Sequence, residues 1–342
     1  MKKTRSSRPA RFVICHLDDG HVSVSKADWT GPRHIKVPGV DFCVASHRLI
    51  AAVIDYRDVQ VLGYDGLVVF QQESFVEVTS LVFHPTFPGV LVVGFVYGDI
   101  KLFDLEKQCE VALLTHHSRC ITSTEITADG RLFVSSYDKT ASIITLDRDF
   151  QVTSSVHLLG HTDYVNSILP LPLWNICVTS STDTTLKVWD CQSGECIRSL
   201  PQHIGPVVVL TSNTSGQIFA GSARCQPVII WSSETFEVLH RISFPCSIDS
   251  LAFDEDGVLY VGVQDCGVMS CNALSGQVGP VAIPASGLIT SISIGTVHVC
   301  ILCSCFSLIF VPQPQCLRAS PGLPPHTPCG PWQNSTACIW LL

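Results

Sequence analysis

The sequence predicts an all-β protein built from a closed ring of small antiparallel sheets. Three observations predict it: one pattern of polar turn and short strand recurs along the chain, its copies are evenly spaced, and no segment shows a sustained helical period of apolar residues. A single small sheet cannot bury both of its faces, so stacked neighbours must supply the core, and closing the ring removes exposed sheet edges.

The copies are spaced by the length of a four-stranded propeller blade. One large apolar residue or cysteine near the end of each third strand serves as an anchor. The anchors are Leu62, Phe103, Ile144, Trp189, Trp231, Cys271 and, more weakly, Ile309. They stand 41, 41, 45, 42, 40 and 38 residues apart, and a period of about 40–45 residues is that of a β-propeller blade.

The clearest copy predicts four strands in order. Val, Ile, Leu and Thr alternate with polar residues, while Asp, Gly and Ser gather at the joins, which is typical of short half-buried strands connected by tight turns. The predicted strands are Tyr164–Leu169, Ile176–Ser180, Thr185–Trp189 and Ile197–Leu200.

The strand count leaves two ring closures open. Seven segments from Val40 to Leu288 are candidate first strands, but eight hairpins are present when Phe12–Ser25 is included. Either this amino-terminal hairpin completes a ring of seven blades, which we favour, or an eighth blade lacks its first strand. The predicted domains are a disordered basic tail over residues 1–10, a propeller over 11–311 and a disordered Pro-rich tail over 312–342.

Polar residues in the clearest copy have the spacing of a buried hydrogen-bond chain. Asp183 lies six residues before Trp189, Ser181 lies eight before it, and His161 lies twenty-two before Asp183. An indole N–H can only donate, a hydroxyl can relay, and a carboxylate accepts from imidazole. The pattern resembles the WD40 repeat family over roughly Phe12–Val311. The resemblance implies a WD40-type β-propeller, with a His–Ser–Asp–Trp chain that stabilises the blade.

The same spacing identifies two partial copies of the chain. One lacks the tryptophan and the other lacks the acidic turn residue. Their predicted members are His116, Ser136, Asp138, His203 and Trp231. Because the His–Ser–Asp trio recurs with constant spacing, a structural repeat explains it better than a catalytic triad does. We therefore predict no catalytic residue.

Loops of such a ring gather where they can bind a partner. Rigid strands hold the loops, so the loops can diverge without unfolding the ring, and exposed Tyr and Arg are favoured binding anchors. The candidate partner-binding residues are His117, Arg119, Tyr137, Asp163, Tyr164, Thr184, Ile204 and Arg224.

The resulting functional prediction is a non-enzymatic scaffold or adaptor that binds partner proteins. The family resemblance leaves a ubiquitin-ligase substrate receptor and a ribosome-assembly factor as alternatives. The first is disfavoured, since Gln192 stands where the Trp-Asp-x-Arg signature of cullin-4 adaptor receptors requires arginine. A propeller hydrolase is a third alternative, but no Gly-rich phosphate loop, nucleophile elbow or paired acidic motif stands outside the repeats.

Composition argues against several partner classes. The net charge of −8 offers nucleic acid no electrostatic attraction. Many of the 17 cysteines occupy strand positions where free thiols act as small hydrophobes. No apolar signal segment follows the basic start, so we expect a cytoplasmic or nuclear location. Cys191 and Cys196 bracket a turn, and Cys300, Cys303 and Cys305 lie close together, but no matching Cys-x-x-Cys or His pair completes a four-ligand site in either place, so we expect neither metal nor cofactor.

An uncharged stretch near the carboxyl end raises the question of a membrane. No Asp, Glu, Lys or Arg occurs between Asp265 and Arg318, and Val299–Val311 is nearly continuously apolar. This segment is shorter than the roughly 20 residues of a membrane-spanning helix. Residues 288–311 reach that length only by including β-like alternation. We expect two buried strands here, with a membrane tether through 288–311 as the alternative.

Overall fold

The structure is a computed structural model whose regular secondary structure, over the described residues, is almost entirely β-strand. It describes residues 13–18, 21–26, 33–38, 40–46, 49–63, 67–87, 89–201, 203, 205–213, 215–223, 227–254, 257–283, 291–294 and 299–303. Among these residues a single 3₁₀ turn, η1 (Pro172–Trp174), interrupts the strands. The prediction of an all-β fold is confirmed. The chain divides into two units, 1–311 and 312–342. The second unit and the predicted basic tail lie outside the described residues.

Six of the sheets have four strands each, and in every one the strands pair antiparallel in chain order. The first sheet has β4 (Val40–Ala45), β5 (Leu49–Ile54), β6 (Asp58–Gly63) and β7 (Val68–Gln72). The second has β8 (Val78–Phe83), β9 (Val90–Phe95), β10 (Asp99–Asp104) and β11 (Cys109–Thr115). The third has β12 (Ile121–Ile126), β13 (Arg131–Ser136), β14 (Ala141–Leu146) and β15 (Val152–Leu158).

The other three four-stranded sheets follow the same plan. The fourth has β16 (Val165–Leu171), β17 (Ile176–Ser181), β18 (Leu186–Asp190) and β19 (Cys196–Leu200). The fifth has β20 (Val207–Ser212), β21 (Ile218–Ala223), β22 (Val228–Ser232) and β23 (Val238–Ile242). The sixth has β24 (Ile248–Phe253), β25 (Val258–Val263), β26 (Gly267–Asn272) and β27 (Val278–Ile283).

The seventh described sheet joins the two ends of unit 1–311. Its order is β28 (Ser291–Ile294), β29 (Val299–Cys303), β1 (Val13–Asp18), β2 (His21–Lys26) and β3 (Arg33–Pro38). Strand β1 pairs with β29 in parallel, with Cys15 opposite Leu302. The amino-terminal hairpin, which we expect from the sequence to complete the ring, therefore pairs with the last strands described, so these backbone groups do not form a free edge.

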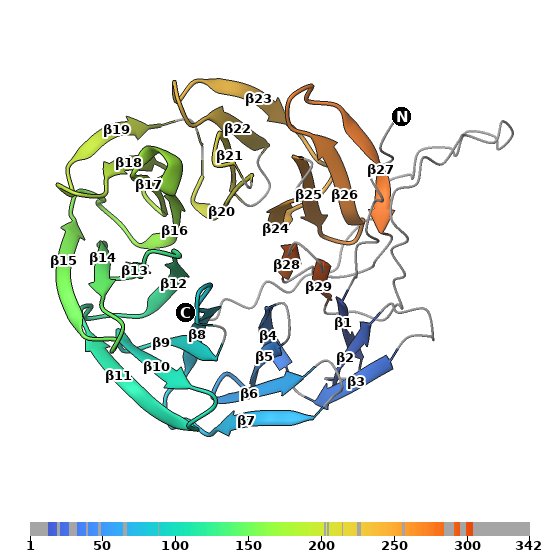
Figure 1. The fold of residues 1–342 in the computed structure, drawn as a ribbon. Coiled ribbons are helices and arrows are strands. Elements are labelled where there is room, and N and C mark those ends of the chain that lie inside the picture. The colour runs from blue at the N-terminus through green and yellow to red at the C-terminus, as the bar shows by residue number, and fades with distance from the viewer. Residues whose placement is uncertain are drawn as a thin grey trace, which may run out of the picture. The chain divides into compact units, whose positions relative to one another are not determined.

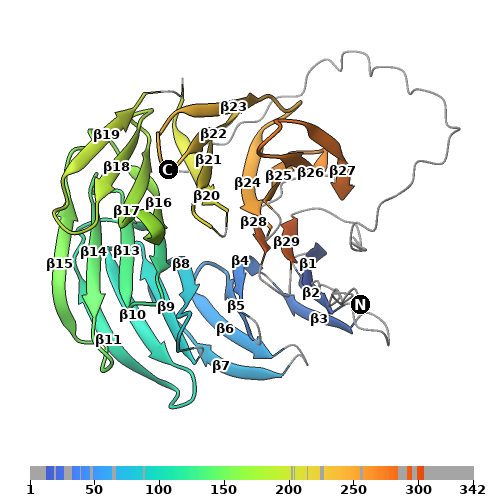
Figure 2. The same cartoon turned by 45° about the horizontal axis from the view of Figure 1, so that its top comes forward.

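The first strands of successive sheets form a closed series within this unit. Strand β8 contacts β4 and β12, β16 contacts β12 and β20, and β24 contacts β20 and β28. Strand β28 in turn contacts β4. Figure 1 shows these strands innermost, with β7, β11, β15, β19 and β23 on the outside, and Figure 2 shows the same order obliquely. This is the β-propeller arrangement that the repeat period predicts.

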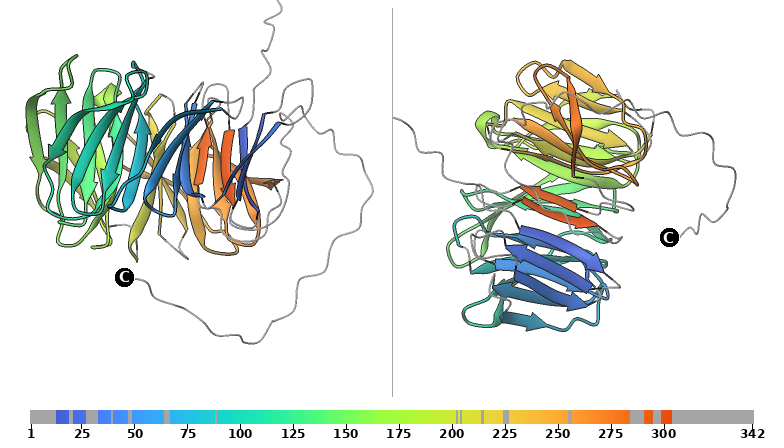
Figure 3. Two further views of the ribbon diagram at one scale, coloured as in Figure 1. Left: turned by 90° about the horizontal axis from the view of Figure 1, so that it is seen from below. Right: turned by 90° about the vertical axis from the view of Figure 1, so that its right-hand side faces the viewer.

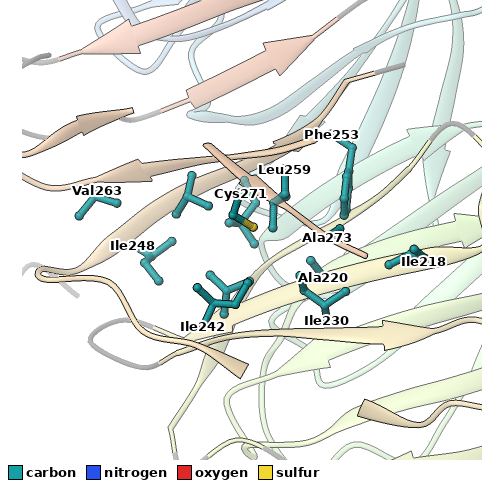
Figure 4. Close-up of a cluster of buried hydrophobic side chains, with 13 residues drawn as sticks. Ile218, Ala220, Ile230, Ile242, Ile248, Phe253, Leu259, Val263, Cys271 and Ala273 are labelled. Carbon is teal, nitrogen blue, oxygen red and sulfur yellow. The ribbon is translucent and has the colours of Figure 1, made fainter. Parts of the chain in front are cut away.

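The core lies between adjacent sheets. Strands in the middle of a sheet are covered on both faces, and all six residues of β9, β17 and β21 are buried. Outer strands such as β19 are mostly exposed. Figure 4 shows one inter-sheet cluster, where Ala220 and Ile230 of the fifth sheet pack near Ile248, Leu259 and Cys271 of the sixth. Each sheet is thus stabilised by its neighbours.

Candidate protein-interaction face

The strands run between two opposite faces of unit 1–311 (Figure 3), and one of these faces carries the described candidate binding residues. We call it the loop face. It bears the turn between the second and third strands of each sheet, and the loop that leads from each fourth strand into the next sheet. Backbone hydrogen bonds join these two kinds of segment: Tyr137 N–H to Cys120 O, Thr182 N–H to Tyr164 O, and Gln264 N–H to Ser247 O, all at 2.9 Å.

Adjacent sheets also meet on this face. At Gly98 in the β9–β10 turn, φ is +95° and a Cβ would lie 2.3 Å from His117 O, so only glycine permits this approach. The ammonium group of Lys139 donates to Thr162 O at 3.0 Å. The turns and loops of neighbouring sheets therefore form one continuous surface here.

Two of the predicted binding residues form an exposed aromatic pair. The rings of Tyr137 and Tyr164 stack with their centroids 4.6 Å apart and their planes at 26°, although they belong to different sheets. Both side chains are exposed, as is Arg119. Asp163 and Thr184 are half-buried. Aromatic rings and arginine are the side chains that most often anchor protein interfaces.

The sequence analysis missed three further aromatic residues on the loop face. Phe75 in the β7–β8 loop is 100% exposed, Tyr97 in the β9–β10 turn is 71% exposed, and Tyr56 in the β5–β6 turn is 60% exposed. Their signal was available, since Tyr56 and Tyr97 occupy the hairpin turns of their copies. The five residues Tyr56, Phe75, Tyr97, Tyr137 and Tyr164 are called the aromatic set below.

One predicted binding residue is not on the surface. His117 is buried and takes part in a hydrogen-bond network instead. Two others, Ile204 and Arg224, lie outside the described residues.

Beneath the loop face, His161 joins the loop before β16 to the turn after β17. Its Nδ1–H donates to Asp183 Oδ2 at 2.7 Å, and its Nε2 lies 2.7 Å from Thr179 Oγ1. Trp189 Nε1–H donates to the same Thr179 oxygen at 2.8 Å. Since the indole needs that oxygen as acceptor, the Thr179 hydroxyl proton is free to donate to His161 Nε2, which assigns the imidazole proton to Nδ1.

The hydroxyl in this network is Thr179, not the predicted Ser181. Trp189 pairs with Cys177, so Thr179 is its diagonal neighbour on the same face of the sheet. Ser181 lies two residues farther toward the turn, where its Oγ donates to Asp163 O and accepts from Asp183 N–H. Ser181 therefore stabilises the turn and leaves the relay to Thr179.

Electrostatics maintain the His161–Asp183 pair. Burial alone raises the pKa of Asp183, but hydrogen bonds from Thr185 and His161 outweigh it and lower that pKa to about 2. Burial lowers the pKa of His161, partly opposed by Asp183. The ring is thus neutral at pH 7. The side chains of His161 and Asp183 are 1% and 8% exposed, so this His–Asp–hydroxyl group faces no substrate space.

The third sheet contains a related network with a shifted histidine. His117, not the predicted His116, has its Nδ1 2.9 Å from Asp138 Oδ2 and its Nε2 2.8 Å from Ser142 Oγ. Ser136 is again outside the relay and donates to Arg119 O. Burial raises the pKa of Asp138, but hydrogen bonds from His117 and Thr140 lower it well below its usual range.

The shift follows from strand length. Both histidines stand four residues before their first strand, but β16 has seven residues and β12 has six. A fixed spacing of twenty-two residues therefore points one position too early in the third sheet. His116 instead stacks on His157, and its buried Nδ1 has no hydrogen-bond partner among the described residues.

The predicted chain between His203 and Trp231 does not form. Both rings are buried in the fifth sheet, and His203 Nε2 and Trp231 Nε1 have no partner within the described ranges. Gly221 occupies the position that corresponds to Thr179, so no hydroxyl is present. The rings pack instead, with centroids 5.6 Å apart.

Other chemistry has little support in the residues that the structure describes. No group of three or more His, Cys, Asp or Glu side chains converges there in a way that could hold a metal ion. No helix among the same residues is long and apolar enough to cross a membrane. Within the segment 288–311, residues 291–294 and 299–303 are strands, and the others lie outside the description.

Family comparison agrees with the repeat geometry. The family described as "WD domain, G-beta repeat" matches residues 108–144 and 153–190. Each match begins at the outermost strand of one sheet and ends on the third strand of the next, so it spans a whole repeat. This chain therefore contains WD40 repeats.

Two proteins that are similar in sequence to this chain share a name. It is 30% identical over 192 residues to a U3 small nucleolar RNA-associated protein 15 homolog from Gallus gallus, covering 51% of the chain and 36% of that protein. It is 28% identical over 235 residues to the Xenopus laevis protein of that name, covering 65% and 43%. The chain thus spans less than half the length of these curated relatives.

A solved structure supports the fold alone. The crystal structure of the computationally designed Ika8 protein superposes with a TM-score of 0.67 at 18% identity, covering 85% of this chain and 92% of that protein. Identity this low carries no information about function.

Proposed function

We propose that this WD40 chain is a non-enzymatic protein-binding module of a nucleolar RNA–protein assembly, and that its loop face holds the partner proteins. The aromatic set is the observation that carries the proposal. Five large aromatic side chains from four consecutive sheets are solvent-exposed on one face, and soluble proteins rarely expose such groups together unless they bind something.

The relatives favour one of the two specific roles that the sequence left open. Their name associates them with the U3 small nucleolar RNA, which supports a ribosome-assembly role over a ubiquitin-ligase receptor. The same name favours a nuclear over a cytoplasmic location.

Protein is the proposed direct partner, even within an RNA-containing assembly. The net charge of −8 disfavours phosphate backbones. Rings such as the Tyr137–Tyr164 stack present amphipathic area at a low entropic cost, because each side chain has only two rotatable angles.

The test is affinity purification of the tagged chain from cells. The variant combines Tyr97→Ala, Tyr137→Ala and Tyr164→Ala. The matched control is Leu173→Ala, which removes a 62% exposed apolar side chain from η1 at the opposite ends of the strands. Recovered U3 RNA and its associated proteins are quantified with and without ribonuclease.

We expect the triple variant to recover at least tenfold less of the U3 RNA-associated proteins than the wild-type chain does. The control variant should recover as much as the wild type. The direct protein partner should survive ribonuclease treatment with the wild-type chain. Unchanged recovery by a folded triple variant, shown by an unaltered thermal melt, would overturn the proposal. So would partners that all vanish with ribonuclease.

A further inference from the structure

Two cysteines of the sixth sheet lie side by side on the loop face. Cys246 is in the β23–β24 loop and Cys266 is in the β25–β26 turn. The Cys266 thiol donates to Cys246 Sγ, with the two sulfur atoms 3.8 Å apart. Cys246 is exposed and Cys266 is half-buried, and both are free thiols. A solvent-accessible dithiol is therefore present where reagents can reach it.

The backbone brings these thiols together independently of the sulfur atoms. Gln264 N–H donates to Ser247 O at 2.9 Å, which ties the turn to the loop one residue beyond Cys246. Cys266 N–H donates to Val263 O at 3.1 Å, which closes the turn. These hydrogen bonds hold both segments, and disulfide formation requires the two sulfur atoms to approach from 3.8 Å to the bond length of about 2 Å.

The position of the pair corresponds to a junction that other sheets fix by hydrogen bonds. In the fourth sheet, the loop before β16 and the turn after β17 are joined by His161 and Asp183. Counted from the paired strands, Cys246 stands at the place of Asp163, and Cys266 at the place of Thr184. In the sixth sheet the thiols thus occupy the same loop–turn junction.

The other cysteines whose side chains the structure describes lack this combination of access and proximity. Cys177 and Cys191 interact with each other, but both are buried. Cys196 is exposed, but its thiol contacts Arg198 O. These residues supply internal controls.

We propose that Cys246 and Cys266 form a reversible disulfide by exchange with a low-molecular-weight disulfide of the glutathione class. The Cys246 thiolate attacks one sulfur of glutathione disulfide, whose S–S bond breaks. One glutathione leaves as its thiolate and takes up the proton that Cys246 released. Cys266 then loses its proton and attacks Cys246 Sγ, and the second glutathione departs and takes up that proton.

The electron balance closes with these reactants: two protein thiols are oxidised, and one glutathione disulfide is reduced to two glutathione molecules. The order of attack follows from access, since Cys246 is the exposed member. Burial raises the pKa of Cys266, as does its hydrogen bond to Cys246, so this thiol keeps its proton until the second step.

The experiment equilibrates the full chain in glutathione buffers of graded redox potential, followed by acid quenching, differential alkylation and peptide mass spectrometry. We expect a peptide cross-linked through Cys246 and Cys266 to appear in buffers where Cys196 carries only a mixed glutathione adduct and Cys177 stays unmodified. Full reduction by dithiothreitol should remove the cross-link.

Variants separate this reaction from general oxidation. Cys266→Ser should trap Cys246 as a stable mixed disulfide, Cys246→Ser should leave Cys266 largely reduced, and Cys196→Ser should leave the cross-link unchanged. In the wild-type chain, amide exchange at Gln264 should slow at least threefold on oxidation, because the turn is then covalently tied to the loop.

Two results would overturn the proposal. In the first, the fraction of Cys246 present as the mixed glutathione disulfide is as high in the wild-type chain as in the Cys266→Ser variant. In the second, Cys246 and Cys266 both remain reduced in buffers in which Cys196 becomes glutathionylated. A folded state of each variant is checked by its β-sheet circular dichroism, so neither result can be attributed to unfolding.

Discussion

The fourth and fifth sheets carry the same two large side chains but use them differently. Each has a histidine four residues before its first strand and a tryptophan on its third strand. In the fourth sheet, His161 and Trp189 both bond to Thr179. In the fifth, the corresponding ring nitrogens have no partner among the residues described. The residue at the position between the two rings differs between these sheets: it is Thr179 in the fourth sheet and Gly221 in the fifth. Only the threonine offers a hydroxyl that both rings can bond to.

The fifth sheet has replaced hydrogen bonds with ring packing. Trp231 stacks on Phe219 with centroids 5.1 Å apart and planes at 12°. A Cβ on Gly221 would lie 3.0 Å from Leu210 Cδ2 and 3.4 Å from Trp231 Cζ3, so a larger residue at this position would require the leucine side chain to shift. Both arrangements stabilise a blade, one through direction-specific polar bonds and the other through buried aromatic area.

Removing the carboxylate of the fourth sheet should cause the largest loss of stability. Asp183→Ala removes the carboxylate acceptor of the buried His161 Nδ1–H, which keeps only the Thr185 hydroxyl 3.5 Å away, and it also removes the acceptor of Thr162 N–H and Thr185 N–H. We expect a loss of about 3–4 kcal/mol in the free energy of unfolding, measured by denaturant titration. Asp149→Ala, at an exposed turn, should change it by less than about 0.5 kcal/mol. Equal effects would refute the network's importance.

Acidification should reveal the buried histidine of the fifth sheet, whose Nε2 has no hydrogen-bond partner among the described residues. Burial, with a further contribution from Arg241, lowers the pKa of His203 from 6.5 to about 4. The unfolded chain therefore takes up a proton at higher pH than the folded chain does. The contribution of neutral His203 to the free energy of unfolding is therefore fully present above pH 6.5. It is lost as the pH falls toward 4, by up to about 3 kcal/mol.

His203→Phe keeps a ring against Trp231 but cannot titrate. We expect the slope of unfolding free energy between pH 6.5 and 4 to be shallower in this variant than in the wild type. The same denaturant titration repeated at several pH values measures it, and an unchanged slope would assign the acid sensitivity to other groups.

Removing the relay hydroxyl should have a smaller effect. Thr179→Val preserves shape but deprives His161 Nε2 and Trp189 Nε1 of their shared partner. We expect a loss of about 2 kcal/mol in unfolding free energy. Ser181→Ala tests the position that the sequence spacing predicts and should cost about 1 kcal/mol, because it loses only turn bonds. A larger loss of unfolding free energy in Ser181→Ala than in Thr179→Val would show that Ser181, and not Thr179, is the hydroxyl of the network.

The finest contrast compares the two tryptophans. Trp189→Phe loses a hydrogen bond to Thr179, whereas Trp231→Phe removes an N–H with no partner in the described chain. We expect Trp189→Phe to cost about 1 kcal/mol more than Trp231→Phe, as measured by the shift in denaturant midpoint. Equal costs would mean that burial of the rings outweighs their polar groups in both sheets.

Local pattern was enough to predict much of this molecule. The repeat period predicts successive four-stranded sheets, and the strand predicted at Ile176–Ser180 differs from β17 by one residue. Likewise His161, Asp183 and Trp189 could be assigned to the loop, the turn and the third strand. These assignments succeed because alternation and turn chemistry are encoded within a few neighbouring residues.

The aromatic set shows an intermediate case. Tyr137 and Tyr164 were predicted on the binding face, whereas Tyr56, Phe75 and Tyr97 were not. Tyr56 and Tyr97 stand in hairpin turns, as Tyr137 does, but a turn position by itself does not say how exposed its side chain is. Only the observed exposures distinguish them.

The sequence by itself determined the ring of short sheets, because each strand pattern and turn is local and repeats at one period. The tertiary structure alone decided that Thr179 serves as relay, that His117 replaces His116, that β1 pairs with β29 and that Cys246 meets Cys266. Each of these depends on strand register or on contact between segments distant in the chain. One residue of extra strand length is enough to change which side chains meet.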